Sequence, residues 1–306
     1  MVPFREVARG LRFPEGPVLM PDGSIVLVEI EGRSLTRVSA DGAKEVIAQL
    51  GGGPNGAALG PDGQCYVCNN GGFEWHHDAQ HGLRPVGQAS DYSGGRIERV
   101  DLESRSVEVL YTQCDGIPLR GPNDLVFDTV GGFYFTDLGK TRGREMDLGS
   151  VYYAQADGSG IRQLAFPLFT PNGIGLSPDG KLLYVAETET CRLWAFDLRE
   201  PGVIEPAAWP PAHGGRIVAG LGGYQKFDSL AVDDTGHIYV ATLLNGGITR
   251  ISPDGQHVTH TPLPDKFVTN LCFSKDFTKA YVTLSGTGRL IEVERAHLLG
   301  AVSFTN

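Results

Sequence analysis

The sequence lacks several features that would place it in a common functional class. It contains no apolar run of about 18 residues, so no membrane-spanning helix is expected. The first residues, Met1 to Val7, do not form the apolar segment of a signal peptide, and we therefore expect a cytoplasmic protein. No GxSxG, HExxH or P-loop motif occurs. These absences argue against a serine nucleophile elbow, a zinc protease of the HExxH type and a P-loop nucleotide site.

Cysteine is also scarce. The chain has five cysteines, scattered and odd in number, which predicts no disulfide framework. Cys65 and Cys68 have CxxC spacing, but residues three apart on a strand point to opposite faces, so we interpret them as packed thiols. The formal net charge is -10 and there is no basic patch, which argues against a nucleic-acid partner.

A short motif recurs along the chain. In each copy the third position carries a carboxylate or a carboxamide. The clear copies are Phe13-Pro14-Glu15-Gly16, Gly53-Pro54-Asn55-Gly56, Gly121-Pro122-Asn123-Asp124 and Thr170-Pro171-Asn172-Gly173, and two looser copies are Lys226-Phe227-Asp228-Ser229 and Val268-Thr269-Asn270-Leu271. The six copies start at residues 13, 53, 121, 170, 226 and 268.

Most copies are followed by a tight turn and then by a strand. Pro21-Asp22-Gly23 and Pro61-Asp62-Gly63 are examples of the turns, in which Pro presets one dihedral angle and Gly accepts a positive φ. The runs that follow are rich in β-branched and aromatic residues. Repeats of about 40 to 50 residues made of short strands are typical of propeller blades. We predict an all-β, six-bladed β-propeller that forms a single domain over residues 1–306.

The two ends of the chain are expected to close the ring of blades. Residues 1–12 are predicted to form a strand outside the first motif, and either the strand from Gly288 to Glu294 or the tail after it is predicted to pair near it. Closing the ring with both termini removes exposed strand edges.

The recurring motif predicts a ring of oxygen atoms around a central channel, because the start of each innermost strand faces the propeller axis. Two members of the ring, Glu15 and Asp228, are acids, and buried carboxylates need a compensating charge. Ligands that are all oxygen suit a hard divalent cation. We therefore predict a metal-binding channel, in which ring positions that do not bind the metal, such as Asn55, orient water or substrate. Singly, each of these residues is also a common turn residue.

Three further features have open alternatives. The insertion 71–94 carries Trp75, His76, His77 and His81, and is either a lid whose His or Trp side chains contact substrate or a hydrated loop packed by its own aromatics. Arg120 either reaches a substrate oxygen or is an ordinary exposed residue. Asp137, at the end of an inner strand, either supports the ring or has no role there.

The motif residues resemble those of the family of senescence marker protein 30 (regucalcin), gluconolactonase and luciferin-regenerating enzyme, over essentially the whole chain. The resemblance implies that Glu15, Asn172 and Asp228 are the metal ligands and that Asp228 is also the general base. It implies that Asn123 contacts substrate and, as in some members of the family, the metal. It also implies one divalent ion, with calcium as our first choice and zinc, magnesium, manganese or iron as alternatives. The insertion 71–94 and the place of Arg120, three residues before Asn123, depart from the family pattern.

These features predict a metal-dependent lactone hydrolase. A metal can polarise a carbonyl, and a neighbouring carboxylate can take a proton from water. We expect a small sugar-derived, aldono-type lactone as substrate, with Asn123, Arg120, Asn55, His76 and His77 as candidate contacts. The alternatives are an organophosphate hydrolase, a strictosidine-synthase-like enzyme, or a non-catalytic binding propeller with structural calcium. The sequence does not identify the lactone or the oligomeric state.

Overall fold

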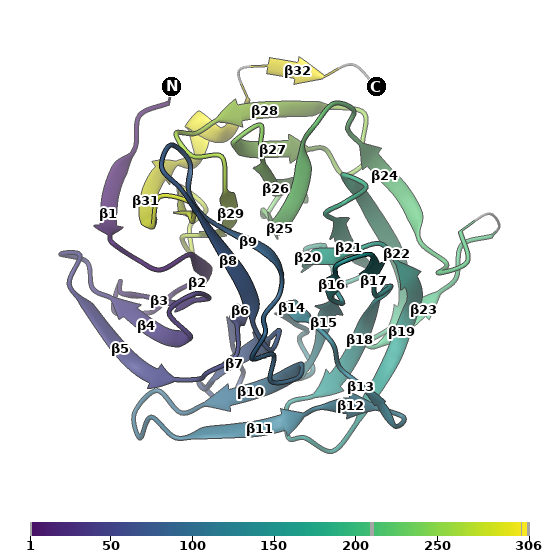
Figure 1. Cartoon of the computed structure of the whole chain (residues 1–306). Helices are drawn as coiled ribbons and strands as arrows, with labels where there is room; N and C mark the ends of the chain where they lie inside the picture. The colour runs from purple at the N-terminus through teal and green to yellow at the C-terminus, as the bar shows by residue number, and fades with distance from the viewer. Residues whose placement is uncertain (1, 209–210, 301, 305–306) are drawn as a thin grey trace.

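The fold is a six-bladed β-propeller, as predicted from the repeats. The structure is a computed structural model that describes residues 2–208, 211–300 and 302–304. Within these residues, six antiparallel sheets of four or five strands stand around a central axis (Figure 1). Three small two-stranded sheets lie in the connections. No helix among the described residues is long and apolar enough to cross a membrane.

The first three blades each contain four strands in a simple meander. Blade 1 comprises β2 (Pro14–Leu19), β3 (Ile25–Glu29), β4 (Ser34–Val38) and β5 (Lys44–Gln49). Blade 2 comprises β6 (Pro54–Leu59), β7 (Cys65–Asn69), β10 (Arg96–Val100) and β11 (Val107–Tyr111). Blade 3 comprises β14 (Pro122–Phe127), β15 (Gly132–Asp137), β18 (Gly149–Gln155) and β19 (Ile161–Leu168).

The remaining blades carry additions at their outer edges. Blade 4 comprises β20 (Pro171–Leu176), β21 (Leu182–Glu187) and β22 (Arg192–Glu200), with β23 (Val203–Glu205) and β24 (Arg216–Gly220) both paired to β22. Blade 5 comprises β25 (Lys226–Val232), β26 (Ile238–Leu243), β27 (Gly247–Ile251), β28 (Val258–Pro262) and β32 (Val302–Phe304). Blade 6 comprises β29 (Val268–Phe273), β30 (Lys279–Leu284), β31 (Arg289–Glu294) and β1 (Arg5–Arg9), and the 3-10 helix η1 (Arg295–Leu298) follows β31.

The N-terminal strand closes the ring. β1 pairs antiparallel with β31, so the start of the chain supplies the outer strand of the last blade. The prediction that residues 1–12 pair with the strand near Gly288 to Glu294 is confirmed. Blade 6 is therefore built from strands at both ends of the chain, and with β1 it has four strands like blades 1 to 3.

Each innermost strand carries an irregularity just after its motif. In all six blades the register between the first and second strands shifts at this point, for example between Glu15 and Val18 in blade 1 and between Phe227 and Leu230 in blade 5. A bulge bends a strand and re-aims the side chains beside it. The repeated bulge therefore turns the motif side chain toward the axis. In a regular strand, successive side chains would instead point alternately to the two neighbouring blades.

The register of blade 6 differs from the sequence prediction by one residue. Leu230 in blade 5 and Leu271 in blade 6 hold matching positions in the pairing of the first two strands. Counting back from these leucines, Thr269 takes the place of Asp228, and Asn270 lies one step further along. The prediction that Asn270 is the sixth member of the ring is therefore wrong. The cause is that Thr269 and Asn270 are adjacent and both carry a side-chain oxygen, so the sequence allows either register in this copy.

The insertion in blade 2 is a β-hairpin that crosses the channel mouth. Its strands are β8 (Phe73–Asp78) and β9 (Gly82–Gln88), drawn in dark blue across the middle of Figure 1. At its tip, the backbone N–H of Leu83 donates to the carbonyl of Gly286 in blade 6, at 2.9 Å. Two shorter hairpins, β12 (Gln113–Cys114) with β13 (Ile117–Pro118) and β16 (Thr141–Arg142) with β17 (Glu145–Met146), lie in and before blade 3.

Candidate active site

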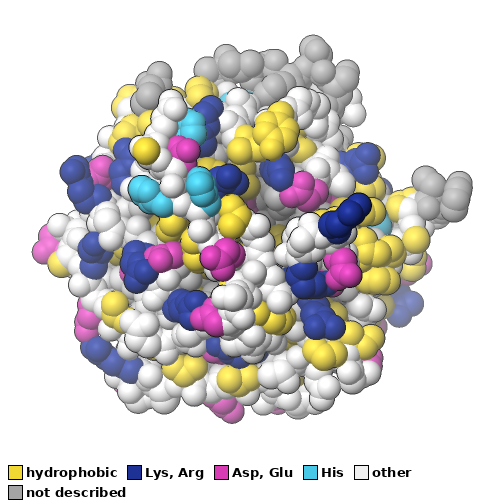
Figure 2. Space-filling model, viewed as in Figure 1, with side chains coloured by type: hydrophobic (Ala, Val, Ile, Leu, Met, Phe, Trp, Pro, Cys, Tyr) yellow, Lys and Arg dark blue, Asp and Glu magenta, His cyan; other side chains and the backbone are white. Residues whose placement is uncertain are grey.

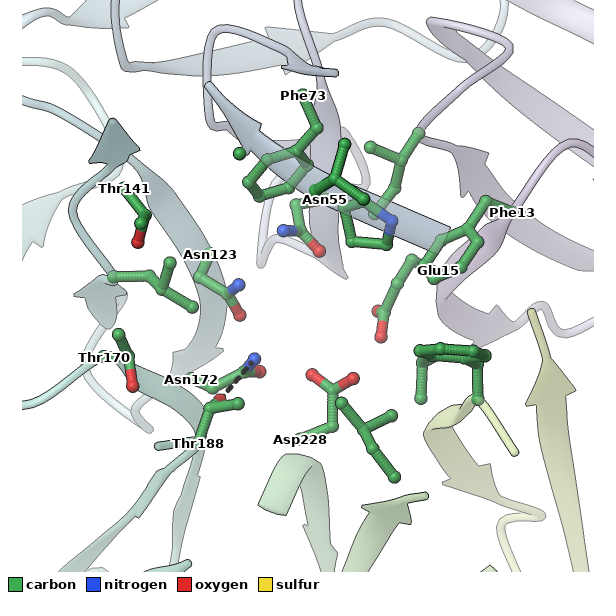
Figure 3. A pocket seen from close by; sticks show the side chains of 18 of the residues that line it. Phe13, Glu15, Asn55, Phe73, Asn123, Thr141, Thr170, Asn172, Thr188 and Asp228 are labelled. Atoms are coloured by element: carbon green, nitrogen blue, oxygen red, sulfur yellow. Dashed lines mark hydrogen bonds between the residues drawn. The ribbon is translucent and has the colours of Figure 1, made fainter. Parts of the chain in front are cut away.

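Five of the motif side chains meet in one cavity at the end of the channel. Glu15, Asn55, Asn123, Asn172 and Asp228 all line a cavity of about 310 Å³. Figure 3 shows these side chains reaching from different blades toward a common space. All five residues are buried. The polar end of the cavity is therefore a ring of carboxylate and amide groups, with Thr269 completing it in blade 6.

Glycine next to the ring lets the inner strands approach closely. A Cβ added at Gly56 would lie 2.5 Å from the carbonyl oxygen of Asn123, and one added at Gly173 would lie 2.6 Å from the backbone nitrogen of Leu230. Gly16 also has a positive φ of 53°. The Gly that follows Glu15, Asn55 and Asn172 in the motif is thus required by the narrowness of the channel.

The ring holds buried negative charge. Burial, together with repulsion from Asp228 and Asp124, raises the pKa of Glu15 well above its ordinary value. Burial likewise raises the pKa of Asp228, although hydrogen bonding with Asn172 acts in the opposite direction. No Lys, Arg or His side chain is among the described residues that line this cavity. The two acids must therefore be protonated or neutralised by a cation that the surrounding chain does not supply.

Asp124 adds a third buried carboxyl group close to the ring. It follows Asn123 in β14 and lines a second cavity, at the side of the ring where Asn270 lies. Burial raises its pKa to about 7. Its charge contributes to the raised pKa values of both Glu15 and Asp228. Three carboxyl groups therefore share one poorly solvated region of the channel.

Hydrogen bonds orient the ring side chains. The Asn270 amide donates to Glu15 Oε2 at 2.6 Å, and the Gly16 N–H donates to the same oxygen. Asn172 Nδ2 donates to Thr188 Oγ1 at 3.2 Å. Asn123 Oδ1 is buried and has no hydrogen-bond partner among the described residues. Since a buried acceptor without a partner is uncommon, this oxygen is a candidate to contact a ligand.

The donor set is made of acids and amides. Among the described residues there is no cluster of three or more His, Cys, Asp and Glu side chains that could hold a metal ion. A cation at the ring would therefore need amide oxygens, from Asn172 or Asn123, beside the carboxylates of Glu15 and Asp228. This composition differs from the His- and Cys-containing sites typical of structural zinc.

Three of the predicted contact residues lie outside the cavity. His76 and His77 are exposed on β8, and Arg120 is exposed at the turn before β14. None of the three lines the cavity that holds the ring. Their predicted contacts with substrate stay predictions that this arrangement does not favour.

Asp137 supports the turn that leads into β14. Its carboxylate accepts backbone N–H groups of Arg120, Gly121 and Gly139, at 2.7, 2.7 and 2.9 Å. This turn immediately precedes Pro122 and Asn123. Asp137 thus fixes the backbone from which the Asn123 side chain enters the cavity.

The hairpin covers the cavity as a lid, and the sequence did not indicate which of its residues line the cavity. Phe73, Pro85, Val86 and Gly87 line the cavity opposite the polar ring. Other apolar and polar wall residues are Phe13, Ile30, Leu138, Thr141, Thr170, Thr188, Glu189, Leu243 and Phe267. Trp75 does not line it; its ring packs on Phe13 with centroids 5.0 Å apart. The site is therefore polar at its base and largely apolar at its cover, a composition typical of pockets for small molecules.

Lys140 anchors the base of this lid, and sequence reasoning missed it. Its ammonium group is buried and donates to Asn70 Oδ1 at 2.9 Å and to the Gly72 carbonyl at 3.0 Å. It also lies 4.0 Å from the ring centroid of Phe73. Burial lowers its pKa to about 7. The charged stretch from Lys140 to Asp147 looks solvated in the sequence, because nothing local indicates that its first residue packs under the hairpin.

Comparison with known proteins agrees with this architecture. The chain is similar to lactonase drp35 of Staphylococcus saprophyticus, with 29% identity over 269 residues, which are 86% of this chain and 74% of the relative. It is also similar to the solved structure of a gluconolactonase from Xanthomonas campestris, with a TM-score of 0.75, 23% identity, and coverage of 95% of this chain and 89% of that one. A third similar structure is a calcium-binding regucalcin of Agrobacterium tumefaciens, with a TM-score of 0.72, 22% identity, and coverage of 95% and 94%.

The family is assigned by a match that spans most of the sequence. The family model of the SMP-30/gluconolactonase/LRE-like region matches residues 13–286, which include all six motif copies. The resemblance seen in the motifs is thereby confirmed, and the chain belongs to the SMP-30/gluconolactonase/LRE-like family.

Proposed function

We propose that this protein is a metal-dependent hydrolase of a sugar-derived, aldono-type lactone. The observation that carries the proposal is the convergence of two buried carboxylates and several amide groups in a cavity without a cationic side chain. Relatives named lactonase and gluconolactonase support a lactone as the substrate class. The cavity of about 310 Å³ falls in the size range of small-molecule sites.

The ring residues fit a divalent cation. Glu15, Asn172 and Asp228 would hold it, and the free acceptor Asn123 Oδ1 would face either the cation or the substrate. Because every donor is oxygen, a hard ion is favoured and calcium is the first choice; magnesium, manganese, zinc and iron are the other ions to assay. When bound, the ion would supply Lewis-acid polarisation of the lactone carbonyl.

Asp228 would act as the general base. Its carboxylate would accept a proton from the attacking water while the water oxygen bonds to the carbonyl carbon. As the ring C–O bond breaks, the same carboxyl group would return the proton to the departing ring oxygen, which gives the hydroxy acid. In the metal-free chain burial raises the pKa of Asp228, whereas a bound cation would favour the ionised carboxylate that a general base requires.

The amide side chains and the lid would position the substrate. Asn123 and Asn55 lie in the ring beside the acids and can bond to the hydroxyl groups or the ring oxygen of a sugar lactone. Phe73, Pro85 and Val86 would cover the opposite side and reduce the access of bulk water. The cover limits the substrate to a size that fits beneath the hairpin.

A metal-supplementation screen tests the proposal. The protein is stripped of metal, then assayed with a pH indicator on sugar and aliphatic lactones in the presence of single divalent ions. We expect metal-dependent turnover that disappears in Asp228→Asn and persists in Asp233→Asn, a matched change at a buried acid elsewhere in blade 5. Metal-independent turnover, or full activity of Asp228→Asn, would contradict the mechanism.

A second candidate is a non-catalytic binding propeller in which calcium stabilises the fold. The description of the Agrobacterium tumefaciens relative as calcium-binding favours it. In that case calcium would raise the melting temperature, but no lactone would turn over faster than in buffer. Phosphotriesters in the same screen test the organophosphate alternative.

A further inference from the structure

An outer cavity, distinct from the one that Asp124 lines, adjoins the cavity that holds the ring. This vestibule has a volume of about 690 Å³ and shares Pro85, Thr188, Glu189, Leu243 and Phe267 with the wall of the inner cavity. Its other lining residues are Asp78, His81, Arg84, Tyr224, Lys226, Leu244 and Lys266. A ligand seated at the ring can therefore extend past the shared wall residues into a larger outer space.

The charge of the vestibule is opposite to that of the inner cavity. Arg84 enters from β9, Lys226 from the start of β25 and Lys266 from the segment before β29. The face crossed by the hairpin carries Lys, Arg and His side chains together with Asp, Glu and hydrophobic ones (Figure 2). The vestibule is lined by these three cations and by two acids, Asp78 and Glu189, so its formal charge is positive in a chain whose net charge is -10.

Two of these cations remain available to a ligand. Lys226 pairs with Glu189 at 2.6 Å. Neither Arg84 nor Lys266 makes a side-chain ion pair with any residue that the structure describes. Asp78 also lines the vestibule, but its carboxylate accepts the backbone N–H groups of Gln80 and His81 in the hairpin turn and forms no ion pair with Arg84 or Lys266.

We propose that the vestibule selects lactones that carry a second, anionic group at the end remote from the ring carbonyl. The group would be a carboxylate or a phosphate monoester, bound by Arg84 and Lys266. The inference rests on the proposed lactone hydrolase function and adds a substrate class to it. Hydrolysis requires the carbonyl to lie at the ring, so the anionic group would lie in the vestibule, which Arg84 and Lys266 line.

In this orientation of the ligand, each of the two cavities would bind a different part of it. Leu243 and Phe267 form part of the apolar wall between them and can pack against the carbon skeleton of the ligand. Arg84 can bind both oxygens of a carboxylate or phosphate through its planar guanidinium group, whereas Lys266 supplies a point charge. The anionic group would thus fix which end of the molecule enters first.

Matched pairs of substrates test the proposal. D-glucono-1,5-lactone is compared with its 6-phospho derivative, and D-glucono-1,4-lactone with D-glucaro-1,4-lactone, at low and high ionic strength. We expect kcat/KM to favour the anionic member of at least one pair by about tenfold at low ionic strength, and by less when salt screens the charges. The pair that shows the preference distinguishes a phosphate from a carboxylate.

The double variant Arg84→Glu/Lys266→Glu should reduce this ratio to about one or below. Lys275→Glu is the matched control, because Lys275 is an exposed lysine at the opposite end of β29 from Lys266. It should keep the wild-type ratio. Equal kcat/KM values within both pairs, or a preference that survives in the double variant, would overturn the inference and leave the proposed lactonase function intact.

A binding measurement decides the inference if no lactone turns over. Calorimetric titration compares D-gluconate with D-glucarate on the wild-type protein and on the double variant. Tighter binding of the dicarboxylate that is lost in the double variant would support the vestibule as an anion subsite, although the proposed hydrolase function would then have failed. Equal binding of the two acids would overturn the inference.

Discussion

Replacing Lys140 by methionine should loosen the lid over the site. The ammonium group of Lys140 connects the segment after β15 to the base of the hairpin through Asn70 Oδ1 and the Gly72 carbonyl. It also faces the rings of Phe73 and Tyr92, at 4.0 and 5.4 Å from their centroids. Methionine fills similar space but offers neither hydrogen bonds nor charge.

The size of the effect follows from these contacts. Two hydrogen bonds from a charged donor contribute about 3 kcal/mol at the lower end of their range, and the contact with the aromatic rings adds about 1 kcal/mol. Neither acceptor is left without a partner, because Asn70 Oδ1 also accepts from the Gly72 N–H and the Gly72 carbonyl from the Ala89 N–H. Removing a buried charge recovers about half of the loss. We therefore expect a decrease of about 2 kcal/mol in the free energy of unfolding.

The kinetic effect should fall on substrate binding. A looser hairpin covers the cavity less often, so KM should rise about fivefold while kcat changes less than about twofold. The measurements are urea unfolding and steady-state hydrolysis of the best lactone from the metal screen. Lys44→Met is the control, since Lys44 donates to the carbonyls of Arg9 and Gly10 at 2.9 and 3.0 Å but is exposed and distant from the hairpin. If both variants had the same stability and the same KM, Lys140 would not anchor the lid.

Three further predictions concern the ring and its cover. Burial raises the pKa of Asp124 above its unfolded value of 3.8 to about 7, so its contribution makes the metal-free protein lose stability as the pH rises between these values; urea unfolding of Asp124→Asn should show a gain over wild type at about pH 8 that is absent at about pH 4, and a gain of equal size at both would refute this. Asn270→Ala removes the amide that donates to Glu15 Oε2 and should weaken metal affinity about tenfold by calorimetry; wild-type affinity would show that this bond does not orient Glu15. Phe73→Ala opens the cover and should raise KM with little change in kcat; an unchanged KM would show that substrate does not touch the hairpin.

The blade pattern could be predicted because it depends on short-range signals. The four clear motif copies join a proline, an oxygen side chain and a strand within a few residues, and three of them are followed by a Pro-Asp-Gly turn. The same local signals identified Glu15, Asn55, Asn123, Asn172 and Asp228, which the structure brings into one cavity. The pairing of β1 with β31 followed from the need to close the ring.

The errors arise where the decisive contacts are remote in sequence. The one-residue slip at Asn270 depends on the pairing of β29 with β30, since Thr269 and Asn270 both carry a side-chain oxygen and only this pairing decides between them. The hairpin at 71–94 is positioned by Lys140 and Gly286, far along the chain, and no pattern within the insertion indicates this. His76 and His77 attract attention by chemistry alone; both are exposed on β8 and neither lines the ring cavity, so their contact with substrate stays a prediction.

The most direct test of the account is a calorimetric titration of calcium into metal-stripped protein. The wild-type chain should bind one ion at the ring. Glu15→Gln and Asp228→Asn should each weaken the affinity about a hundredfold, because each removes one of only two carboxylates at the ring. Unchanged affinity in both variants would contradict the claim that Glu15, Asn172 and Asp228 hold a single cation.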